Sequence, residues 1–465
     1  MRTRFVAPFS ILVSILFSSL AIALTVASGS ANAQSAKPMI EKIVKEISAE
    51  HIEKIIRKLV SFETRNTLSE TESNTRGIGA ARRWIKSELE TCARANGGKM
   101  QVAFDDNLAP ISARIPKPTS VVNVVATLPG TQAESKDRLY VVSGHYDSMP
   151  DSPTDGVTAA PGANDDASGT AAVMELACVM SKYKFDATLV FMTVAGEEQG
   201  LIGSTFWAKK ARAQGLNVAA MITNDIIGSS RAADGTVNDE HVRLFAEGVP
   251  PPLKEPTDET ATLMRSGGEN DFSTRQLGRF IKEAAERNVA GMTVDLIYRR
   301  DRYLRGGDHS PFLDAGYPAV RFTELAEDYR HQHKNPRVEN GVQIGDLPEF
   351  VDFNYIAKVA RVNAAALASL ALAPAAPKEV QMETKVLEND STMIWKANTE
   401  PDLAGYRIVW RDTNAPYWQQ SRDVGNVTRA TIKGVSKDNV IFGVQALDKD
   451  GNASVATYPV PMRVR

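Results

Sequence analysis

Cysteine is scarce in this chain. Only Cys92 and Cys178 occur among 465 residues, which excludes a fold held together by a dense set of disulfides. One bridge between them is open to the chain, but two small buried apolar residues are the favoured interpretation. Neither has a histidine or a second cysteine at ligand spacing, so we expect no thiolate metal ligand.

The chain also lacks an excess of charge of either sign. Its 54 lysine and arginine residues nearly balance 56 aspartate and glutamate residues. No global field attracts nucleic acid or an anionic membrane, so we expect no nucleic-acid partner. Beyond the first 33 residues we expect no run apolar enough to span a bilayer, and hence no stable membrane insertion of the mature chain.

The amino terminus has the three parts of a secretory signal. The chain begins Met1-Arg2-Thr3-Arg4, continues as an apolar run from Phe5 to about Val26, and then reaches Ala31-Asn32-Ala33. We predict cleavage after Ala33 and export to the periplasm or the medium. The alternative is an uncleaved membrane anchor, because the apolar run is rather long.

Apolar, β-branched runs then alternate with helical patterns. Apolar residues at three- and four-residue spacing predict helices over about 50–63, 78–95, 167–183, 204–213, 274–286 and 350–372. Predicted strands lie at 121–125, 139–142, 189–192, 219–222 and 320–323. The alternation predicts an α/β fold with a mixed or mainly parallel sheet, whose functional residues gather where the strands end.

The pattern of apolar and polar residues changes after the small-residue linker Ala373-Pro374-Ala375-Ala376-Pro377. Short alternating runs separated by turns follow it and predict a small all-β sandwich. This segment resembles a fibronectin type III domain through Trp395, the strand entry Asp402-Leu403-Ala404-Gly405-Tyr406 and the ending over 444–452. We predict a signal peptide over 1–33, an α/β domain over 34–373 and a fibronectin type III-like domain over 374–465.

A histidine and a carboxylate follow one predicted strand in the motif Gly144-His145-Tyr146-Asp147-Ser148. In an extended segment His145 and Asp147 point to the same side, so the carboxylate lies near the imidazole. Such a pair is the usual arrangement around a protein metal. Taken alone, however, the motif fits a structural histidine better.

Carboxylates also stand in pairs at other strand ends. Asn164-Asp165-Asp166 opens a helix, where one carboxylate is ordinarily a cap but two repel unless a cation or strong donors lie nearby. Glu197-Glu198 ends a strand between glycines, with a solvated face as the alternative. Asn224-Asp225 and Tyr329-Arg330-His331-Gln332-His333 follow two more strands. Nitrogen and oxygen donors without a thiolate suit zinc in a hydrolytic role.

In their order these motifs resemble the co-catalytic zinc aminopeptidase family that contains the bacterial leucyl aminopeptidases and plasma glutamate carboxypeptidase. The resemblance covers about residues 50–372. The matching signatures are Gly144-His145-Tyr146-Asp147-Ser148, Pro161-Gly162-Ala163-Asn164-Asp165-Asp166-Ala167-Ser168-Gly169, Ala195-Gly196-Glu197-Glu198-Gln199-Gly200-Leu201 with Gly203-Ser204, Asn224-Asp225 and Asp308-His309. The family fold is an α/β sandwich with a mixed, mainly parallel sheet.

The resemblance implies two Zn²⁺ ions per chain. His145 and Asp225 would hold one ion, Glu198 and a late histidine would hold the other, and Asp165 would bridge them. The family also implies that Asp147 orients the histidine ligand from behind. It implies further that Glu197 is the general base.

The late histidine is either His331 or His333, which periodicity cannot separate because both point the same way in an extended segment. The family commonly has an acidic or amide residue four positions after its ligand. His331 has Asn335 there, whereas His333 has Arg337. An amide can accept the remaining imidazole N–H, so we favour His331 as the ligand, with His333 near the substrate or in the outer shell.

Three features depart from the family or lie outside its ligand set. Asn164 stands where an aspartate is frequent. Asp308 can cap the helix that Pro311 begins, and we assign Asp308 and His309 to structure. The segment 226–307 carries no matching motif, and we expect substrate selection to reside partly there.

The resemblance thus implies an exported zinc metallopeptidase acting on peptide or protein substrates, most simply an aminopeptidase that releases amino-terminal residues. The alternatives are a carboxypeptidase or dipeptidase, a glutaminyl-cyclase-like transferase, and a non-catalytic binding protein on the same scaffold. The domain over 34–373 would be the di-zinc peptidase, and the sandwich is a candidate for binding a polymer or a surface.

Overall fold

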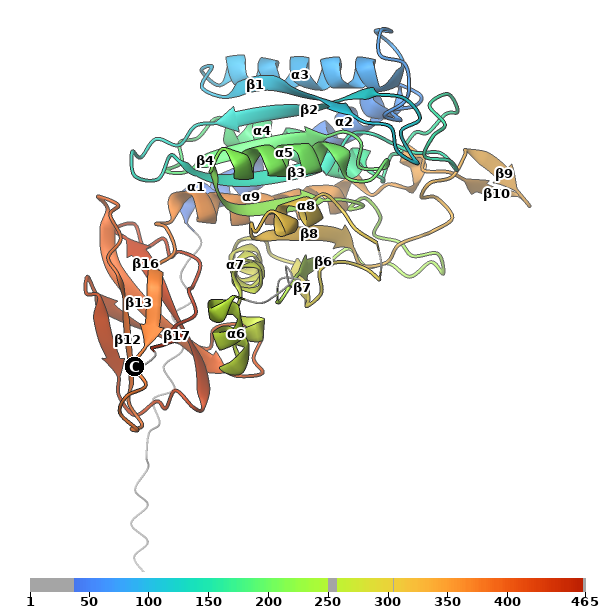
Figure 1. Ribbon diagram of the computed structural model, residues 1–465. Coiled ribbons are helices and arrows are strands. Elements are labelled where there is room, and N and C mark those ends of the chain that lie inside the picture. Colours follow the sequence, from blue (N-terminus) through green and yellow to red (C-terminus); the bar gives the residue numbers. More distant parts are fainter. Residues whose placement is uncertain (1–36, 250–256, 304, 463–465) are drawn as a thin grey trace, which may run out of the picture. The chain divides into compact units, whose positions relative to one another are not determined.

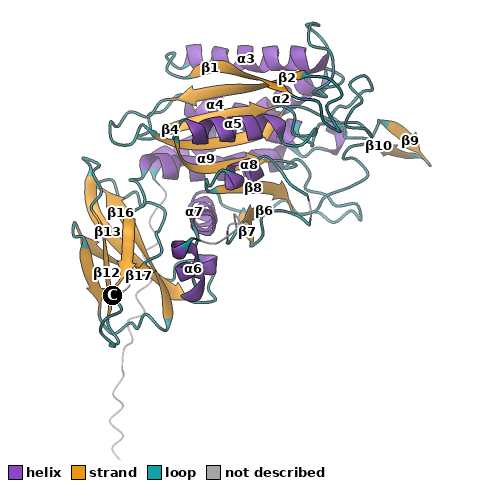
Figure 2. Ribbon diagram, viewed as in Figure 1, coloured by secondary structure: helices purple, strands orange, loops and turns teal. Residues whose placement is uncertain are grey.

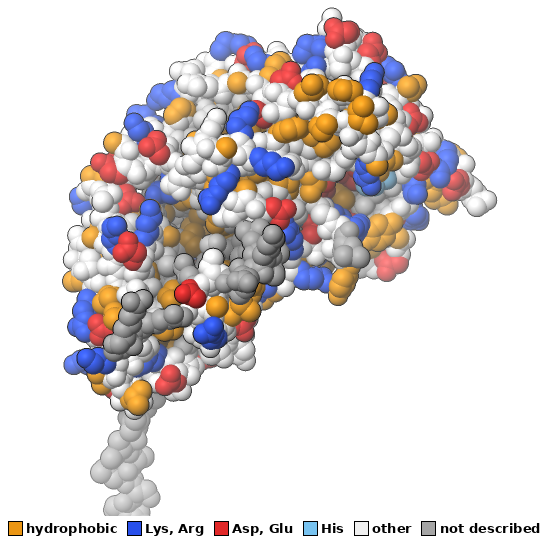
Figure 3. Space-filling view, in the orientation of Figure 1, with side chains coloured by type: hydrophobic (Ala, Val, Ile, Leu, Met, Phe, Trp, Pro, Cys, Tyr) orange, Lys and Arg blue, Asp and Glu red, His pale blue; other side chains and the backbone are white. Residues whose placement is uncertain are grey.

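The computed structural model describes residues 37–249, 257–303 and 305–462 (Figure 1). The signal peptide predicted for 1–33 lies outside these residues. Basic and acidic side chains are interspersed over the face that Figure 3 shows, in keeping with the balanced composition.

An eight-stranded mixed sheet organises the larger part of the chain, in the order β1-β2-β4-β3-β5-β8-β6-β7. Strands β4, β3, β5 and β8 are parallel at its centre, whereas β1, β2 and β6 each run antiparallel to a neighbour. The predicted α/β class and mixed, mainly parallel sheet are confirmed. The strands are β1 Gln101–Ala109, β2 Thr119–Leu128, β3 Arg138–His145, β4 Thr188–Val194, β5 Asn217–Asn224, β6 His241–Ala246, β7 Thr293–Ile297 and β8 Ala319–Glu324.

Helices cover both faces of this sheet (Figure 2). Val142 of β3 faces a core shared with α1–α4, α7 and α9, and Val141 faces a second core shared with α5 and α8. Both faces are buried, which explains the near-continuous apolar runs of the central strands. The helices are α1 Pro38–Glu46, α2 Ala49–Val60, α3 Gly77–Ala95, α4 Ala167–Met180, α5 Ile202–Ala213, α6 Asp258–Arg265, α7 Ser273–Asn288, α8 His309–Asp314 and α9 Phe353–Leu372.

Two expectations about the core need correction. Cys92 of α3 and Cys178 of α4 form a disulfide, with their Cα atoms 5.1 Å apart, rather than being two free buried thiols. Spacing along the chain could not show this, because only helix packing brings positions 86 residues apart together. Helix α9 is also long and apolar enough to cross a membrane, but 78% of its most apolar window is buried inside the protein.

The carboxyl-terminal segment forms two small sheets, ordered β15-β12-β11-β17 and β14-β13-β16. Val380 and Trp395 from one sheet share a core with Tyr406 and Phe442 from the other. These strands are β11 Lys378–Met382, β12 Ser391–Lys396, β13 Leu403–Asp412, β14 Gln420–Gly425, β15 Arg429–Ile432, β16 Val440–Asp448 and β17 Val460–Pro461, and the hairpin β9 Arg337–Glu339 with β10 Val342–Ile344 precedes α9.

Candidate metal centre

Loops at the carboxyl ends of the central parallel strands bring the predicted ligands together. His145 ends β3, Glu198 lies four residues after β4, and Asp225 directly follows β5. Asp165 lies just before α4, and His333 lies on the chain that follows β8. Parallel strands end at one edge of the sheet, so five positions spread over 189 residues of sequence become neighbours.

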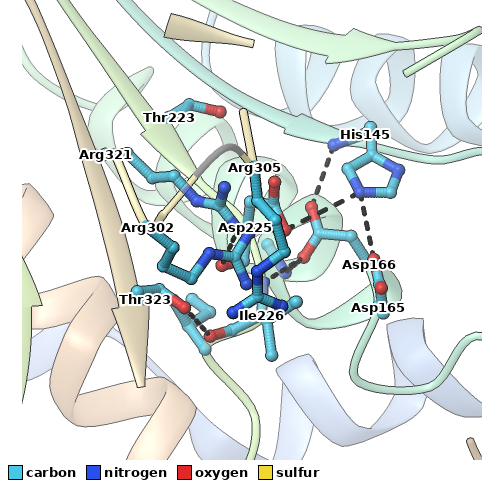
Figure 4. A network of polar contacts seen from close by, with 12 residues as sticks. His145, Asp165, Asp166, Thr223, Asp225, Ile226, Arg302, Arg305, Arg321 and Thr323 are labelled. Carbon is cyan, nitrogen blue, oxygen red and sulfur yellow. Dashed lines mark hydrogen bonds and ion pairs between the residues drawn. The ribbon is translucent and has the colours of Figure 1, made fainter. Parts of the chain in front are cut away.

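A first group consists of His145, Asp165 and Asp225, all of them buried. The Nε2 atom of His145 lies 3.2 Å from Asp165 Oδ1 and 3.9 Å from Asp225 Oδ1 (Figure 4). One ligand atom from each residue lies within 4.8 Å of the others. This spacing suits one small cation held by nitrogen and oxygen donors.

A second group consists of Asp165, Glu198 and His333. The Nε2 atom of His333 lies 3.0 Å from Asp165 Oδ2 and 3.1 Å from Glu198 Oε2. Glu198 Oε1 is buried and has no hydrogen-bond partner among the described residues, which fits an oxygen meant for a metal. Asp165 offers one oxygen to each group, so it can bridge two ions.

The electrostatics of the two groups show an excess of negative charge. Burial alone would lower the pKa of His333, but the carboxylates of Glu198 and Asp165 raise it to about 12. Burial would raise the pKa of Asp165, but the charges of His333 and His145 hold it well below its usual value. The donor set therefore fits zinc both in atom type and in its need for a cation.

The structure groups His333 with Asp165 and Glu198 and leaves His331, the histidine that we favoured from the sequence, outside the second group. Its Nδ1 atom lies 3.1 Å from the main-chain oxygen of Gly345, and its ring stacks on Phe350 with centroids 3.8 Å apart. His333 takes a positive φ of 52°, so the two imidazoles do not point the same way as they would in a strand. Asn335 accepts a hydrogen bond from the main chain of Asp151 instead of from an imidazole.

Asp147 lies behind the first group, as the resemblance implied. Its Oδ1 atom is 3.4 Å from His145 Nδ1, and its main-chain oxygen is 3.1 Å from the same nitrogen. Its other oxygen, Oδ2, accepts hydrogen bonds from Thr67 and from the main-chain N–H of Glu198. Asp147 therefore orients the histidine and also fixes the loop that carries the second group.

Glu197 adjoins both groups. Its main-chain N–H donates to Asp147, at 3.4 Å, and its side chain is half-buried. Burial raises the pKa of its carboxyl well above the usual value, and the charges of Asp225, Glu198 and Asp308 raise it further, although His145 opposes them. A carboxylate with this affinity for a proton is suited to accept one during a reaction.

Sequence reasoning missed Arg321 of β8, whose side chain is fully buried. Its Nη2 atom lies 2.9 Å from Asp225 Oδ1, and its Nη1 atom lies 3.0 Å from Asp301 Oδ2. Burial alone would lower the pKa of Arg321, but these two carboxylates hold it above its usual value. A charged residue inside the run Ala319-Val320-Arg321-Phe322 was the available signal.

Two buried aspartates hold the loop of the bridging residue, and sequence reasoning missed only one of them, Asp346. Asp346 accepts the main-chain N–H groups of Asn164 and Asp165, at 2.7–3.0 Å. Asp166 accepts from the main chain of His145 and caps α4 through Gly169 N–H, both at 2.9 Å. Of the acidic pair after Asn164, Asp165 therefore belongs to the candidate metal groups, whereas Asp166 caps α4.

Asp308 and His309 lie outside both groups. Asp308 precedes α8, but its side chain makes no capping hydrogen bond, so the predicted capping role is wrong. Burial raises the pKa of its carboxyl to about 7, and the charges of Asp147 and Asp225 contribute. His309 Nε2 lies 2.8 Å from the main-chain oxygen of Arg300.

Comparisons with known proteins identify the family of this chain. The sequence model of peptidase family M28 matches residues 123–337. A probable zinc metalloprotease of Leptosphaeria maculans is 47% identical over 422 residues, which are 91% of this chain and 97% of the relative. One of Pyricularia oryzae is 47% identical over 421 residues, or 90% and 83% of the two chains. The LapA aminopeptidase of Legionella pneumophila shares the fold, with a TM-score of 0.50 and 19% identity over 71% of this chain and 74% of LapA.

Proposed function

This chain belongs to peptidase family M28, the family of zinc metalloproteases, and we propose that it is a two-zinc exopeptidase that removes residues from the amino terminus of peptides. The observation that carries the proposal is the position of the Asp165 carboxylate between the two groups. Its two carboxylate oxygens lie beside different histidines, 3.2 Å from His145 and 3.0 Å from His333. A carboxylate shared in this way is the arrangement that two neighbouring ions need.

His145 and Asp225 would hold one zinc ion, Glu198 and His333 the other, and Asp165 would bridge them. When bound, the two ions supply a water molecule of lowered pKa and polarise the scissile carbonyl. Arg321 contacts the same Oδ1 atom of Asp225 that lies nearest His145, so it fixes the position of this carboxylate beside the proposed ion. Asp147 keeps the His145 ring in place through its Nδ1 side.

Glu197 moves the proton. Its carboxylate accepts a proton from the attacking water and returns it to the nitrogen of the departing amine. Its position follows from the loop after β4, where Asp147 holds the main-chain N–H groups of both Glu197 and Glu198. One carboxylate thereby fixes the base and a ligand of the second group relative to each other.

The charge of the site supports amino-terminal recognition. Glu197, which is half-buried, and the buried Asp308 are carboxyl groups beyond the proposed ligands. A free α-ammonium group carries the complementary charge, whereas a blocked amine or a free carboxylate does not. Export, and a separate sandwich domain over 374–465 that binds a polymer or a surface, are further proposals that rest on the sequence.

The test uses the purified mature protein with p-nitroanilides of several amino acids, each with a free and an acetylated amine. We expect about two zinc ions per chain by mass spectrometry, cleavage of the free amines, and no cleavage of the acetylated ones. Cleavage of amino-blocked peptides with a free carboxylate would indicate a carboxypeptidase instead. Zinc-free protein without activity towards any peptide would indicate a binding protein.

A further inference from the structure

An arginine cluster is formed by Arg243 of β6 together with Arg302 and Arg305 of the loop between β7 and α8. Three guanidinium groups surround the buried carboxylate of Glu327. Arg243 Nη2 lies 2.8 Å from Glu327 Oε1 and Arg302 Nη1 lies 2.9 Å from Oε2, whereas Arg305 Nη2 lies 3.5 Å from Oε1. Both oxygens are thus taken at short distance by two of the arginines, and Arg305 makes the weakest of the three contacts.

The other nearby carboxylate does not neutralise Arg305 either. Asp301 lies 3.0 Å from Arg321 and 3.3 Å from Arg302. The Arg305 side chain is 43% exposed, compared with 10% for Arg302 and none for Arg321. Its further contacts are the Tyr329 hydroxyl, at 3.4 Å, and the Tyr329 ring, which carry no negative charge to offset it. Arg305 is therefore the guanidinium of this cluster with donors left for another anion.

The cluster lies at the rim of the metal centre. A Cβ atom added at Gly307 would lie only 3.2 Å from Asp225 Oδ2, so the main chain there runs against a proposed ligand. Two residues of chain span at most about 7 Å, which places Arg305 Cα within that distance of Gly307 Cα. Tyr329, which contacts Arg305, precedes His333 by four residues. Arg321 pairs with Asp225, and the same close-up shows Arg302 and Arg305 (Figure 4).

We infer that Arg305 binds a carboxylate of the substrate and selects short or acidic peptides. This inference rests on the proposed function. A guanidinium matches a carboxylate with two parallel N–H donors. The acidic metal centre would take the amino end of the peptide, and Arg305 would take negative charge one or two residues away. That charge is either the terminal carboxylate of a short peptide or an acidic side chain.

The experiment compares peptides that differ only in this charge. The holoenzyme is assayed with leucyl-alanine, leucyl-alanine amide and leucyl-glutamate amide, which share the leucyl amino terminus. The variants are Arg305→Ala, Arg305→Lys and the matched control Arg299→Ala, an exposed arginine of the same loop that stacks on Tyr303. Zinc content and thermal unfolding are measured for each variant.

For Arg305→Ala we expect KM for leucyl-alanine to rise roughly tenfold or more, with kcat and the kinetics of leucyl-alanine amide nearly unchanged. Arg305→Lys should recover part of the loss, and Arg299→Ala should resemble the wild type. A loss confined to leucyl-glutamate amide would identify an acidic side chain as the group bound. A loss confined to leucyl-alanine would identify the terminal carboxylate.

Equal effects of Arg305→Ala on the charged and the uncharged peptides would overturn the inference, because the residue would then only support the loop. If the wild type hydrolyses none of the peptides, the proposed function fails. Calorimetric binding of leucyl-alanine and its amide then decides the inference separately. Tighter binding of the free acid that disappears in Arg305→Ala upholds it, and equal or absent binding rejects it.

Discussion

At the scale of a residue, the adjacent Glu197 and Glu198 after β4 have different proposed roles. Glu198 belongs to the second metal group, whereas Glu197 does not. We expect Glu197→Gln to lower kcat by at least about a hundredfold while zinc content and folding stay normal, because only proton transfer is removed. Steady-state kinetics together with mass spectrometry check this. Near-normal turnover in that variant would contradict the role of Glu197.

The two late histidines should differ in zinc binding. His333→Ala removes a nitrogen that lies about 3 Å from both Asp165 and Glu198, so we expect loss of the second zinc ion and of activity. His331→Ala removes a ring that stacks on Phe350, so it should keep both ions and lose some stability. Zinc counting by mass spectrometry distinguishes the two variants. Two ions retained in the His333 variant would show that His333 is not a ligand of the second zinc ion.

Asn164 has a reason to be an amide. Its Nδ2 atom donates to both oxygens of the buried Glu324, at 3.0–3.1 Å, and its Oδ1 atom accepts from Gly228 N–H. Asn164→Asp replaces the donor with a second carboxylate, so we expect a loss of about 1–3 kcal/mol of unfolding free energy. Denaturant unfolding measures it. Adding Glu324→Gln restores a donor and should recover part of the lost unfolding free energy. A folding defect unrelated to this pair would not be corrected by the second substitution.

At the scale of an element, one titratable pair joins α2 to α4. His51 Nδ1 contacts the buried Glu175, which also accepts the Ser48 main-chain N–H at the start of α2. The hydrogen bond to Glu175 raises the pKa of His51 above its usual value, against the effect of burial. The folded state therefore holds this proton more tightly than the unfolded state does.

The sign of the pH dependence follows from that shift. The stabilising effect is complete below the unfolded pKa of about 6.5 and is lost as pH rises through the higher folded pKa. We expect His51→Gln to lower the melting temperature more at pH 6 than at pH 9. Thermal unfolding at both values checks this, with Glu175→Gln as the background in which the difference should vanish. An equal shift at both pH values would mean that the pair contributes no charge effect.

Elements of the fold differ in how well the sequence predicts them. The central strands are apolar on both faces, so β3, β4, β5 and β8 were predicted as strands. Edge strand β1 was not, because its residues are mostly exposed and it carries Asp105 and Asp106. Strands β6 and β7 alternate apolar with polar or half-buried residues over only five or six positions, a pattern too short to separate from loop.

At the scale of the whole molecule, a buried ion cluster joins the sandwich to the larger fold. Arg411 of β13 donates to both oxygens of Asp271, at 2.8–2.9 Å, and Arg279 of α7 lies 3.1 Å from the same carboxylate. All three side chains are almost fully buried. The linker predicts a separable domain, but removing the sandwich would take away Arg411, so that Arg279 alone would balance the charge of Asp271.

Asp271→Asn should therefore destabilise the whole chain. It leaves two buried guanidinium groups without a counter-charge, which costs about 3–5 kcal/mol. Kinetics on a dipeptide should change little, because Asp271 belongs to neither metal group. The matched control is Asp423→Asn, which breaks an exposed ion pair with Arg407 of the same strand β13 and should have little effect. Equal melting temperatures for the two variants would show that the buried cluster does not join the two parts.

The sequence by itself determined most of the side chains that form the two candidate metal groups. Local motifs at strand ends contain His145, Asp165, Glu198 and Asp225, and a strand of apolar residues predicts where its own end lies. The tertiary structure decided between His331 and His333, paired Cys92 with Cys178, and placed Arg321 on Asp225. The physical reason is that these choices depend on contacts between residues far apart in the chain and on loop conformation, whereas periodicity reports only which face of one element each residue occupies.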